Sequence, residues 1–201
     1  VIKTRWDNCD ICRNTKLKNQ LKNSHELQSY FIQKIDSFVH SRNRAIIGWD
    51  EILEGGLAEN AWVMSWRGTK GGIEAAKQKH NVVMTPGTHC YFDHYQGPVD
   101  IEPLAIGGYT TIEKVYNYKI IPEELDSNQK QFIQGAQGNV WTEYIKTPEM
   151  VEYMSVPRMT ALSEIVWSKR KKRDFSEFRK RLNFYKYFLD KKKVNYRNKD
   201  L

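Results

Sequence analysis

Four short and nearly continuous apolar runs divide the chain. They are AIIGW at 45–49, AWVMSW at 61–66, NVVMTP at 81–86 and FIQGAQGNVW at 132–141. Runs of this length without polar alternation are typical of strands that are buried on both faces of a parallel sheet. We therefore predict one strand in each run.

The segments between these runs show helical spacing. An apolar stripe over 24–41 follows Ser24, a candidate N-cap, and further helices are predicted at 71–79, near 110–117, at 148–167 with an interruption at Pro157, and over a last segment with one apolar face from Phe175 to Leu189. Strands that alternate with helices predict parallel βα units. Either an open four-stranded doubly wound domain or half of an eight-stranded barrel fits this order.

The residues after the strands favour a carbohydrate ligand over a nucleotide ligand. Neither GxGxxG nor GxxxxGK occurs, so a nucleotide-binding domain is disfavoured. Sugar rings lie with their apolar faces against indoles, and their hydroxyls need oriented acceptors. Because chemistry gathers at the C-terminal ends of parallel strands, we predict a sugar site from the aromatic and acidic groups found there, which are Trp49-Asp50-Glu51, Trp66-Arg67, Tyr91-Phe92-Asp93 and Trp141-Thr142-Glu143.

Five ordered motifs resemble one known family. They are GWDEILEGG (48–56), VMSWRG (63–68), YFD (91–93), GAQGNVWTEY (135–144) and PRMTALSEIVW (157–167). In this order they resemble the second half of glycoside hydrolase family 20, the β-N-acetylhexosaminidases. The resemblance implies an α/β fold, the second half (about strands 5–8 with their helices) of a TIM (β/α)8 barrel. It places the half-barrel of the catalytic domain in residues 1–168 and a basic C-terminal helix and tail, packing on the barrel, in residues 169–201.

The same resemblance implies a retaining, exo-acting enzyme that removes terminal N-acetylglucosamine or N-acetylgalactosamine. In this family the substrate's own 2-acetamido oxygen attacks the anomeric carbon. The family's catalytic Asp-Glu pair stands in a GGDE motif shortly before a tryptophan like Trp6, and no GGDE occurs among the 201 residues. We therefore expect this chain to be inactive by itself.

Individual roles follow from the resemblance. Tyr91 resembles the catalytic tyrosine that donates its hydroxyl to the acetamido oxygen. Asp93 and Glu143 resemble acceptors for the outer hydroxyls, and the walls of the sugar pocket correspond to Trp49, Trp66 and Trp141. No metal and no cofactor is implied.

Other charged residues in these motifs are expected to be structural. Asp50 and Glu51 do not replace the missing pair, because neighbours on an extended strand point to opposite faces. We interpret them as supporting groups at a strand end. Arg67 is expected to hold a carboxylate and Arg158 to anchor a helix start, and neither is expected to contact sugar.

The net charge of +8 is local to the C-terminal end. Residues 169–201 hold 14 Lys and Arg against 4 Asp and Glu, whereas the rest of the chain holds 18 and 20. A stretch such as KRKKR at 169–173 is able to contact phosphates or an anionic surface, but a solvated helix face is the simpler interpretation. We expect no nucleic-acid partner, and no apolar run is long enough for a membrane span.

The three cysteines do not indicate a particular function. Three cysteines are too few for a disulfide scaffold. Cys9 and Cys12 form a CxxC motif, but a zinc site needs a second ligand pair, for which Cys90 and His89 are a poor match. A thioredoxin-type site needs a strand before the motif and a helix starting at it, whereas the sequence predicts a polar loop. Two interpretations remain for this pair: a local disulfide that closes the loop, or two free thiols.

The expected partners are glycans that contain N-acetylhexosamine, together with the missing N-terminal half of the barrel or a second copy of the chain. A half-barrel leaves strand edges unpaired, which favours association. Two other functions stay open: a catalytically silent carbohydrate-binding unit, and a basic interaction module that acts through residues 169–199. No secretion leader opens the chain, and a periplasmic or extracellular parent enzyme is expected only because such enzymes are commonly exported.

Overall fold

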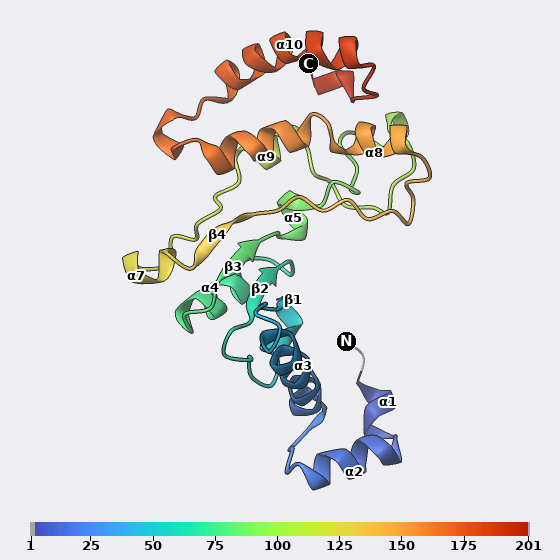
Figure 1. The fold of residues 1–201 in the computed structure, drawn as a ribbon. Coiled ribbons are helices and arrows are strands. Elements are labelled where there is room, and N and C mark those ends of the chain that lie inside the picture. The colour runs from blue at the N-terminus through green and yellow to red at the C-terminus, as the bar shows by residue number, and fades with distance from the viewer. Residues whose placement is uncertain (1–2, 201) are drawn as a thin grey trace. The chain divides into compact units, whose positions relative to one another are not determined.

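The computed structural model describes residues 3–200 (Figure 1). The chain forms two compact units. The first unit comprises the residues up to Met84 together with Ile121–Gln134, and the second unit comprises Thr85–Ile120 together with the residues from Gly135 onward. The predicted boundary at residue 168 does not coincide with either unit's limits and stays a prediction for the domain organisation.

Parallel strands form the centre of the first unit. They are β1 (Ile47–Trp49), β2 (Trp62–Ser65) and β3 (Val82–Met84), and the sheet order is β1-β2-β3-β4, with β4 at Ile133–Ala136. Gly48 pairs with Val63, which in turn pairs with Val82, and both pairings are parallel. All four predicted strands are therefore present, and the predicted parallel order is confirmed for β1 to β3. Each strand is shorter than its apolar run.

The helices of the first unit are α1 (Thr4–Asp7), α2 (Asp10–Lys18), α3 (Ser24–His40), η1 (Asp50–Leu53), α4 (Lys70–Lys77) and α7 (Ser127–Lys130). Helix α4 lies directly on β2 and β3 through Gly72, Ala75 and Ala76, which are buried. A Cβ at Gly72 would lie 2.6 Å from Met84 Sδ, so this close approach of helix to sheet requires glycine.

Helix α3 differs from the prediction at its start and on its apolar side. Its N-cap is Asn23, whose side-chain oxygen accepts hydrogen bonds from the backbone N–H groups of His25 and Glu26, so the prediction of Ser24 as the cap was wrong by one residue. The apolar stripe is largely exposed, with Phe31 62% and Phe38 61% accessible. Instead, the polar residues Gln28, Ser29 and Asp36 of this helix are buried.

The polar side of α3 holds the turn after β1. Gln28 Nε2 donates to Glu51 O at 2.8 Å, and Ser29 Oγ donates to Glu54 O at 3.1 Å. The Glu54 carbonyl thereby gains a donor, and the Glu51 carbonyl, which also accepts the backbone N–H of Glu54, gains a second one. The helix is thus attached to the strand end by hydrogen bonds, and Phe31, Ile35 and Phe38 of its apolar stripe remain exposed.

The second unit is mainly helical. Its elements are α5 (Gly87–Cys90), η2 (Val99–Ile101), α6 (Ile112–Tyr116), α8 (Pro148–Ser155), α9 (Arg158–Trp167), η3 (Arg170–Lys172), α10 (Phe175–Lys192) and η4 (Asn198–Asp200). The predicted interruption at Pro157 is confirmed, because α8 ends before this residue and α9 begins after it. Among residues 3–200, no helix has both the length and the apolar character needed to cross a bilayer.

The core of the second unit includes the inner face of α10. Phe178, Leu182 and Leu189 of this helix are buried, and the ring of Phe178 stacks on Tyr116 of α6 with centroids 4.8 Å apart. Asp174 caps the helix by accepting a hydrogen bond from the backbone N–H of Glu177. Figure 1 shows α10 beside α9 (red and orange).

Candidate functional site

The predicted sugar-site residues divide between the two units. Trp49 and Trp66 follow β1 and β2 in the first unit. The second unit holds the other four, which are Tyr91, Asp93, Trp141 and Glu143.

In the first unit, Asp50 joins the ends of β1 and β2. Its side chain is only 2% exposed. Its Oδ2 accepts the backbone N–H groups of Trp66 and Arg67 at 3.0 and 3.1 Å, and Arg67 Nε donates to Oδ1 at 2.5 Å. Both oxygens are thus occupied by protein donors, which is the supporting role expected from the sequence for Asp50 and for Arg67.

Glu51 orients one of the predicted wall residues. The indole Nε1–H of Trp66 lies 3.0 Å from Glu51 Oε2 and 3.2 Å from Oε1. A hydrogen bond from a neutral donor to a carboxylate is stronger than one between neutral groups. Glu51 therefore limits the orientations of the Trp66 ring.

Glu54 completes a charged cluster beside these strand ends. It accepts hydrogen bonds from Lys3 Nζ and Arg67 NH1, each at 2.7 Å. The hydrogen bond from Lys3, followed by that from Arg67, lowers the pKa of Glu54 to about 2, and the hydrogen bond to Glu54 raises the pKa of Arg67. A hollow of about 380 Å³ next to the cluster is lined by Asp50, Leu53, Glu54, Arg67, Lys70, Gly71 and Glu74.

In the second unit, two predicted aromatic residues lie close together. Tyr91 pairs with Asn139 as an isolated parallel bridge, in which Phe92 N–H donates to Asn139 O at 2.7 Å. The ring centroids of Tyr91 and Trp141 are 6.4 Å apart, with an interplanar angle of 49°. This close approach of the two segments depends on Gly138, where a Cβ would lie 2.5 Å from the Phe92 ring.

Asp93 is a buried carboxylate with one oxygen unoccupied. It is 4% exposed, and its Oδ1 has no hydrogen-bond partner among the residues that the structure describes. Burial raises the pKa of Asp93; backbone N–H groups of Asp93 and Trp141 act against this rise, and the nearby Glu143 carboxylate adds to it. A buried acceptor without a donor is costly, so this oxygen is suited to a ligand hydroxyl.

Arg158 holds the backbone on both sides of Asp93. It is fully buried at the first position of α9, and its guanidinium donates to Phe92 O at 2.5 Å and His94 O at 3.1 Å. A third carbonyl, Thr110 O, accepts at 2.9 Å. The expected place at a helix start is confirmed, but the contact with the Asp93 backbone was not predicted. An arginine in line with the apolar positions Ala161 and Ile165 was the available signal.

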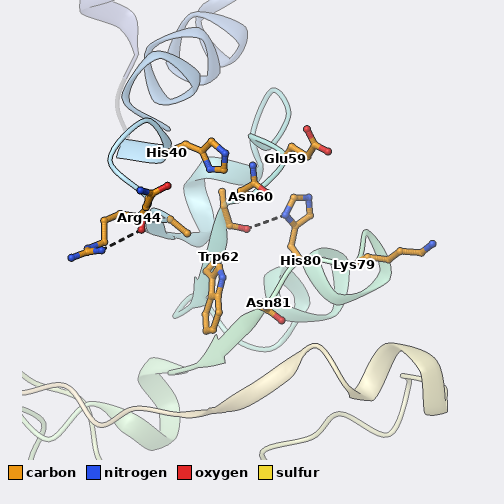
Figure 2. A pocket seen from close by; sticks show the side chains of 11 residues that line it. His40, Arg44, Glu59, Asn60, Trp62, Lys79, His80 and Asn81 are labelled. Atoms are coloured by element: carbon orange, nitrogen blue, oxygen red, sulfur yellow. Dashed lines mark hydrogen bonds between the residues drawn. The ribbon is translucent and has the colours of Figure 1, made fainter. Parts of the chain in front are cut away.

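A second hollow lies at the opposite ends of the strands (Figure 2). Its volume is about 450 Å³, and it is lined by His40, Asn43, Arg44, Ala45, Glu59, Asn60, Ala61, Trp62, Lys79, His80 and Asn81. His80 Nδ1 lies 2.9 Å from Ala61 O. Because this hollow is at the N-terminal ends of β2 and β3, it is not the predicted sugar site. Within residues 3–200, no group of three or more His, Cys, Asp and Glu side chains is arranged to hold a metal ion.

Known relatives of this chain are β-hexosaminidases. A β-hexosaminidase of Porphyromonas gingivalis is 47% identical over 195 residues, which cover 96% of this chain and 25% of the relative. A β-hexosaminidase of Vibrio furnissii is 26% identical over 162 residues, or 79% of this chain and 26% of the relative. The chain thus spans about a quarter of the length of these relatives.

The fold of this chain also matches solved structures of family 20 enzymes. The structure of the family 20 exo-β-N-acetylglucosaminidase of Vibrio harveyi in complex with N-acetylglucosamine matches with a TM-score of 0.87 at 27% identity, over 96% of this chain and 31% of that one. A Flavobacterium johnsoniae chitobiase matches with a TM-score of 0.78 at 28% identity, over 96% and 28% of the two chains. The α/β fold therefore matches part of the family's TIM-barrel structures.

The profile of the glycosyl hydrolase family 20 catalytic domain matches residues 1–170, which include all five motifs noted in the sequence. The resemblance carried by these motifs is confirmed, and the chain belongs to glycosyl hydrolase family 20.

Proposed function

We propose that this chain supplies the second half of the (β/α)8 catalytic barrel in a retaining, exo-acting β-N-acetylhexosaminidase. Its substrates would be glycans with terminal N-acetylglucosamine or N-acetylgalactosamine. The parallel strands in sequential order, the intervening helices and the similarity to an enzyme whose structure holds N-acetylglucosamine support this proposal.

In the proposed reaction the substrate provides its own nucleophile. The acetamido oxygen attacks the anomeric carbon while the glycosidic oxygen is protonated and leaves, and water then opens the cyclic intermediate with retention. The proton donor and the group that orients the acetamide would be the Asp-Glu pair of a GGDE motif, which does not occur in these 201 residues. Tyr91 would donate its hydroxyl to the acetamido oxygen and so favour the attacking geometry.

The observation that carries the proposal is the unoccupied oxygen of Asp93. It is buried next to a backbone that carries two aromatic residues, Tyr91 and Trp141. An aromatic face together with a buried acceptor suits a pyranose, because the ring covers the apolar surface and a hydroxyl supplies the missing donor. Sugars without that hydroxyl would leave the carboxylate unpaired and bind poorly.

The test is release of p-nitrophenol from its N-acetyl-β-glucosaminide. The 201-residue chain is compared with a form extended at its N-terminus to include a GGDE segment. We expect release only from the longer form, and Asp93→Asn in that form should lower kcat/KM by about 100-fold because one buried charged hydrogen bond to the sugar is lost. Asp100→Asn, an exposed aspartate in the same unit, is the matched control and should keep full activity.

Other results would redirect the assignment. Release by the 201 residues alone would place the acid/base within them, with Asp50, Glu51, Asp93 and Glu143 as candidates. Full activity of the Asp93→Asn enzyme would contradict the role of Asp93. If neither form releases product, the chain is better described as a silent carbohydrate-binding unit, for which binding of N-acetylglucosamine should be lost in Trp141→Ala and should exceed binding of glucose.

We also propose that the chain associates with the missing half of the barrel or with a second copy. Strand β1 lies at the edge of the sheet, and Ile47 on it is exposed together with Phe31, Ile35 and Phe38 of α3. Exposed apolar side chains next to an unpaired strand edge favour association. Analytical ultracentrifugation of the 201-residue chain tests this, and a folded monomer at all concentrations would contradict it.

A periplasmic or extracellular site of action remains part of the proposal. Fractionation of cells that produce the protein, followed by the p-nitrophenol assay on each fraction, tests it directly.

A further inference from the structure

The CxxC motif lies at the start of a helix, and not in the polar loop expected from the sequence. Cys9 is the N-cap of α2, with φ −100° and ψ 124°, and its carbonyl accepts the backbone N–H of Arg13 at 2.9 Å. Cys12 is the third residue of the helix. The N-cap and third helical positions lie on the same side of the first turn, where the Cβ atoms of residues three apart are about 5–6 Å from each other. A disulfide needs about 3.5–4.5 Å, so its closure would draw the two Cβ atoms together by about 1–2 Å.

The pKa values of the two thiols are shifted in opposite directions. The Cys9 side chain makes no capping hydrogen bond to α2, but the backbone N–H of Cys12 favours its thiolate form. This N–H, followed by the Cys12 thiol, lowers the pKa of Cys9. The pKa of Cys12 is raised, first because its proton is held by Cys9. Cys9 is thus suited to attack a disulfide first, and Cys12 to attack the resulting mixed disulfide.

Accessibility separates this pair from the third cysteine. Cys9 and Cys12 are both partly exposed, whereas Cys90 is buried. Burial raises the pKa of the Cys90 thiol to about 12. Cys90 therefore provides an unreactive reference within the same chain.

We propose that Cys9 and Cys12 form a redox couple that closes as a disulfide across the first turn of α2 by exchange with small-molecule disulfides. The Cys9 thiolate attacks one sulfur of the small disulfide, forms a mixed disulfide and releases one thiol. Cys12 then loses its proton, attacks the Cys9 sulfur and releases the second thiol. The protein dithiol is oxidised, and one small disulfide is reduced to two thiols.

The surroundings keep the start of α2 in place for this reaction. Asp7 of α1 accepts hydrogen bonds from Ser24 Oγ at 2.5 Å and from Lys16 Nζ at 3.1 Å, so α1, α2 and the start of α3 are joined by one carboxylate. Both cysteines belong to α2, and this helix is held to α1 through Lys16 and Asp7. A disulfide would link the N-cap and the third residue of this one helix.

A redox titration with reduced and oxidised glutathione tests the proposal. At each potential, free thiols are alkylated and mapped by mass spectrometry on the folded 201-residue chain. We expect Cys9 and Cys12 to lose alkylation together and to appear as one peptide linked internally, while Cys90 reacts only after unfolding. Persistent glutathione adducts on Cys9, a disulfide between chains, or continued alkylation of both thiols in oxidising buffer would overturn the proposal.

Single variants separate the two roles. In Cys12→Ala, the mixed disulfide on Cys9 should persist because no second thiol resolves it, and the pH midpoint of Cys9 alkylation should move up. In Cys9→Ala, formation of a mixed disulfide should be slower than in Cys12→Ala, because Cys12 lacks the backbone N–H that lowers the pKa of Cys9. Cys90→Ala should titrate like the original chain. Equal reaction rates of the two single variants at neutral pH would contradict the assigned order of attack.

Discussion

Carboxylates at strand ends differ sharply between the two units of this chain. In the first unit, Asp50, Glu51 and Glu54 are each occupied by backbone, indole, lysine or arginine donors. In the second unit, Asp93 is equally buried but keeps one oxygen without a partner among the described residues. The same type of residue thus has both oxygens hydrogen-bonded after β1 and keeps one oxygen without a partner in the segment that follows β3 and α5.

The difference has a consequence for stability. Removal of a buried carboxylate that is fully hydrogen-bonded strongly destabilises the protein, because its partners are then left unpaired. A buried carboxylate with an open oxygen already costs stability in the free protein. Such a cost is typical of sites that are completed by a ligand.

The largest effect is expected where a single residue maintains the available site. Arg158→Met should lower the free energy of unfolding by about 3–5 kcal/mol, because several buried carbonyls beside Asp93 lose their donor. Urea unfolding followed by circular dichroism measures this change. Arg179→Met, on an exposed position of α10, is the control and should stay within about 0.5 kcal/mol. Equal midpoints for both variants would show that the buried guanidinium does not support this region.

A matched pair of aspartate variants tests the comparison itself. Asp50→Asn should cost about 2 kcal/mol, because it weakens a buried charged cluster whose arginine is partly exposed. Asp93→Asn should leave stability unchanged or raise it by up to about 1 kcal/mol, because it removes a desolvated charge. The midpoints of urea unfolding at pH 7 measure the change in stability of each variant. If Asp93→Asn costs as much as Asp50→Asn, the two carboxylates are both structural.

The pH dependence of stability should have opposite signs in the two regions. The pKa of Glu54 is lowered from 4.5 to about 2, so its contribution is present above pH 4.5 and is lost as the pH falls from 4.5 towards 2. Solvent screening limits this loss to about 1 kcal/mol. The pKa of Asp93 is raised, so its penalty appears as the pH rises above the usual range of an aspartate.

Urea titrations at several pH values check both signs. Glu54→Gln should remove the loss of stability below pH 4.5, and Asp93→Asn should give its gain only at higher pH. A gain for Asp93→Asn that is constant down to pH 2.5 would contradict a raised pKa.

The smallest effect is expected at the indole of Trp66. Glu51→Gln keeps an acceptor but removes its charge, so it should cost only about 0.5–1 kcal/mol. The NMR signal of the Trp66 indole N–H should shift to lower frequency as its hydrogen bond weakens. Glu124→Gln, an exposed substitution in the same unit, should leave this signal in place. An unchanged signal in Glu51→Gln would mean that Glu51 does not orient the ring.

The strands and most long helices could be predicted because their signals are local. Continuous apolar runs mark β1 to β4, and the periodic segment after Pro157 marks α9. The prediction failed at α2, where a polar helix of nine residues carries no apolar stripe and its cap is a cysteine. It also failed on the buried side of α3, because the choice of face depends on Glu51 and Glu54 carbonyls that lie far away in sequence.

Residue type and order along the chain were enough to determine the family, the parallel βα arrangement and the candidate residues from Trp49 to Glu143. They did not determine which of these acids are occupied. Asp50 and Asp93 both follow an aromatic residue near a strand end, and only the folded chain brings Arg67 and two backbone N–H groups to the first while leaving an oxygen of the second open. Hydrogen-bond partners and burial arise from contacts between distant segments, so only the tertiary structure decides which of these two carboxylates keeps an oxygen without a partner.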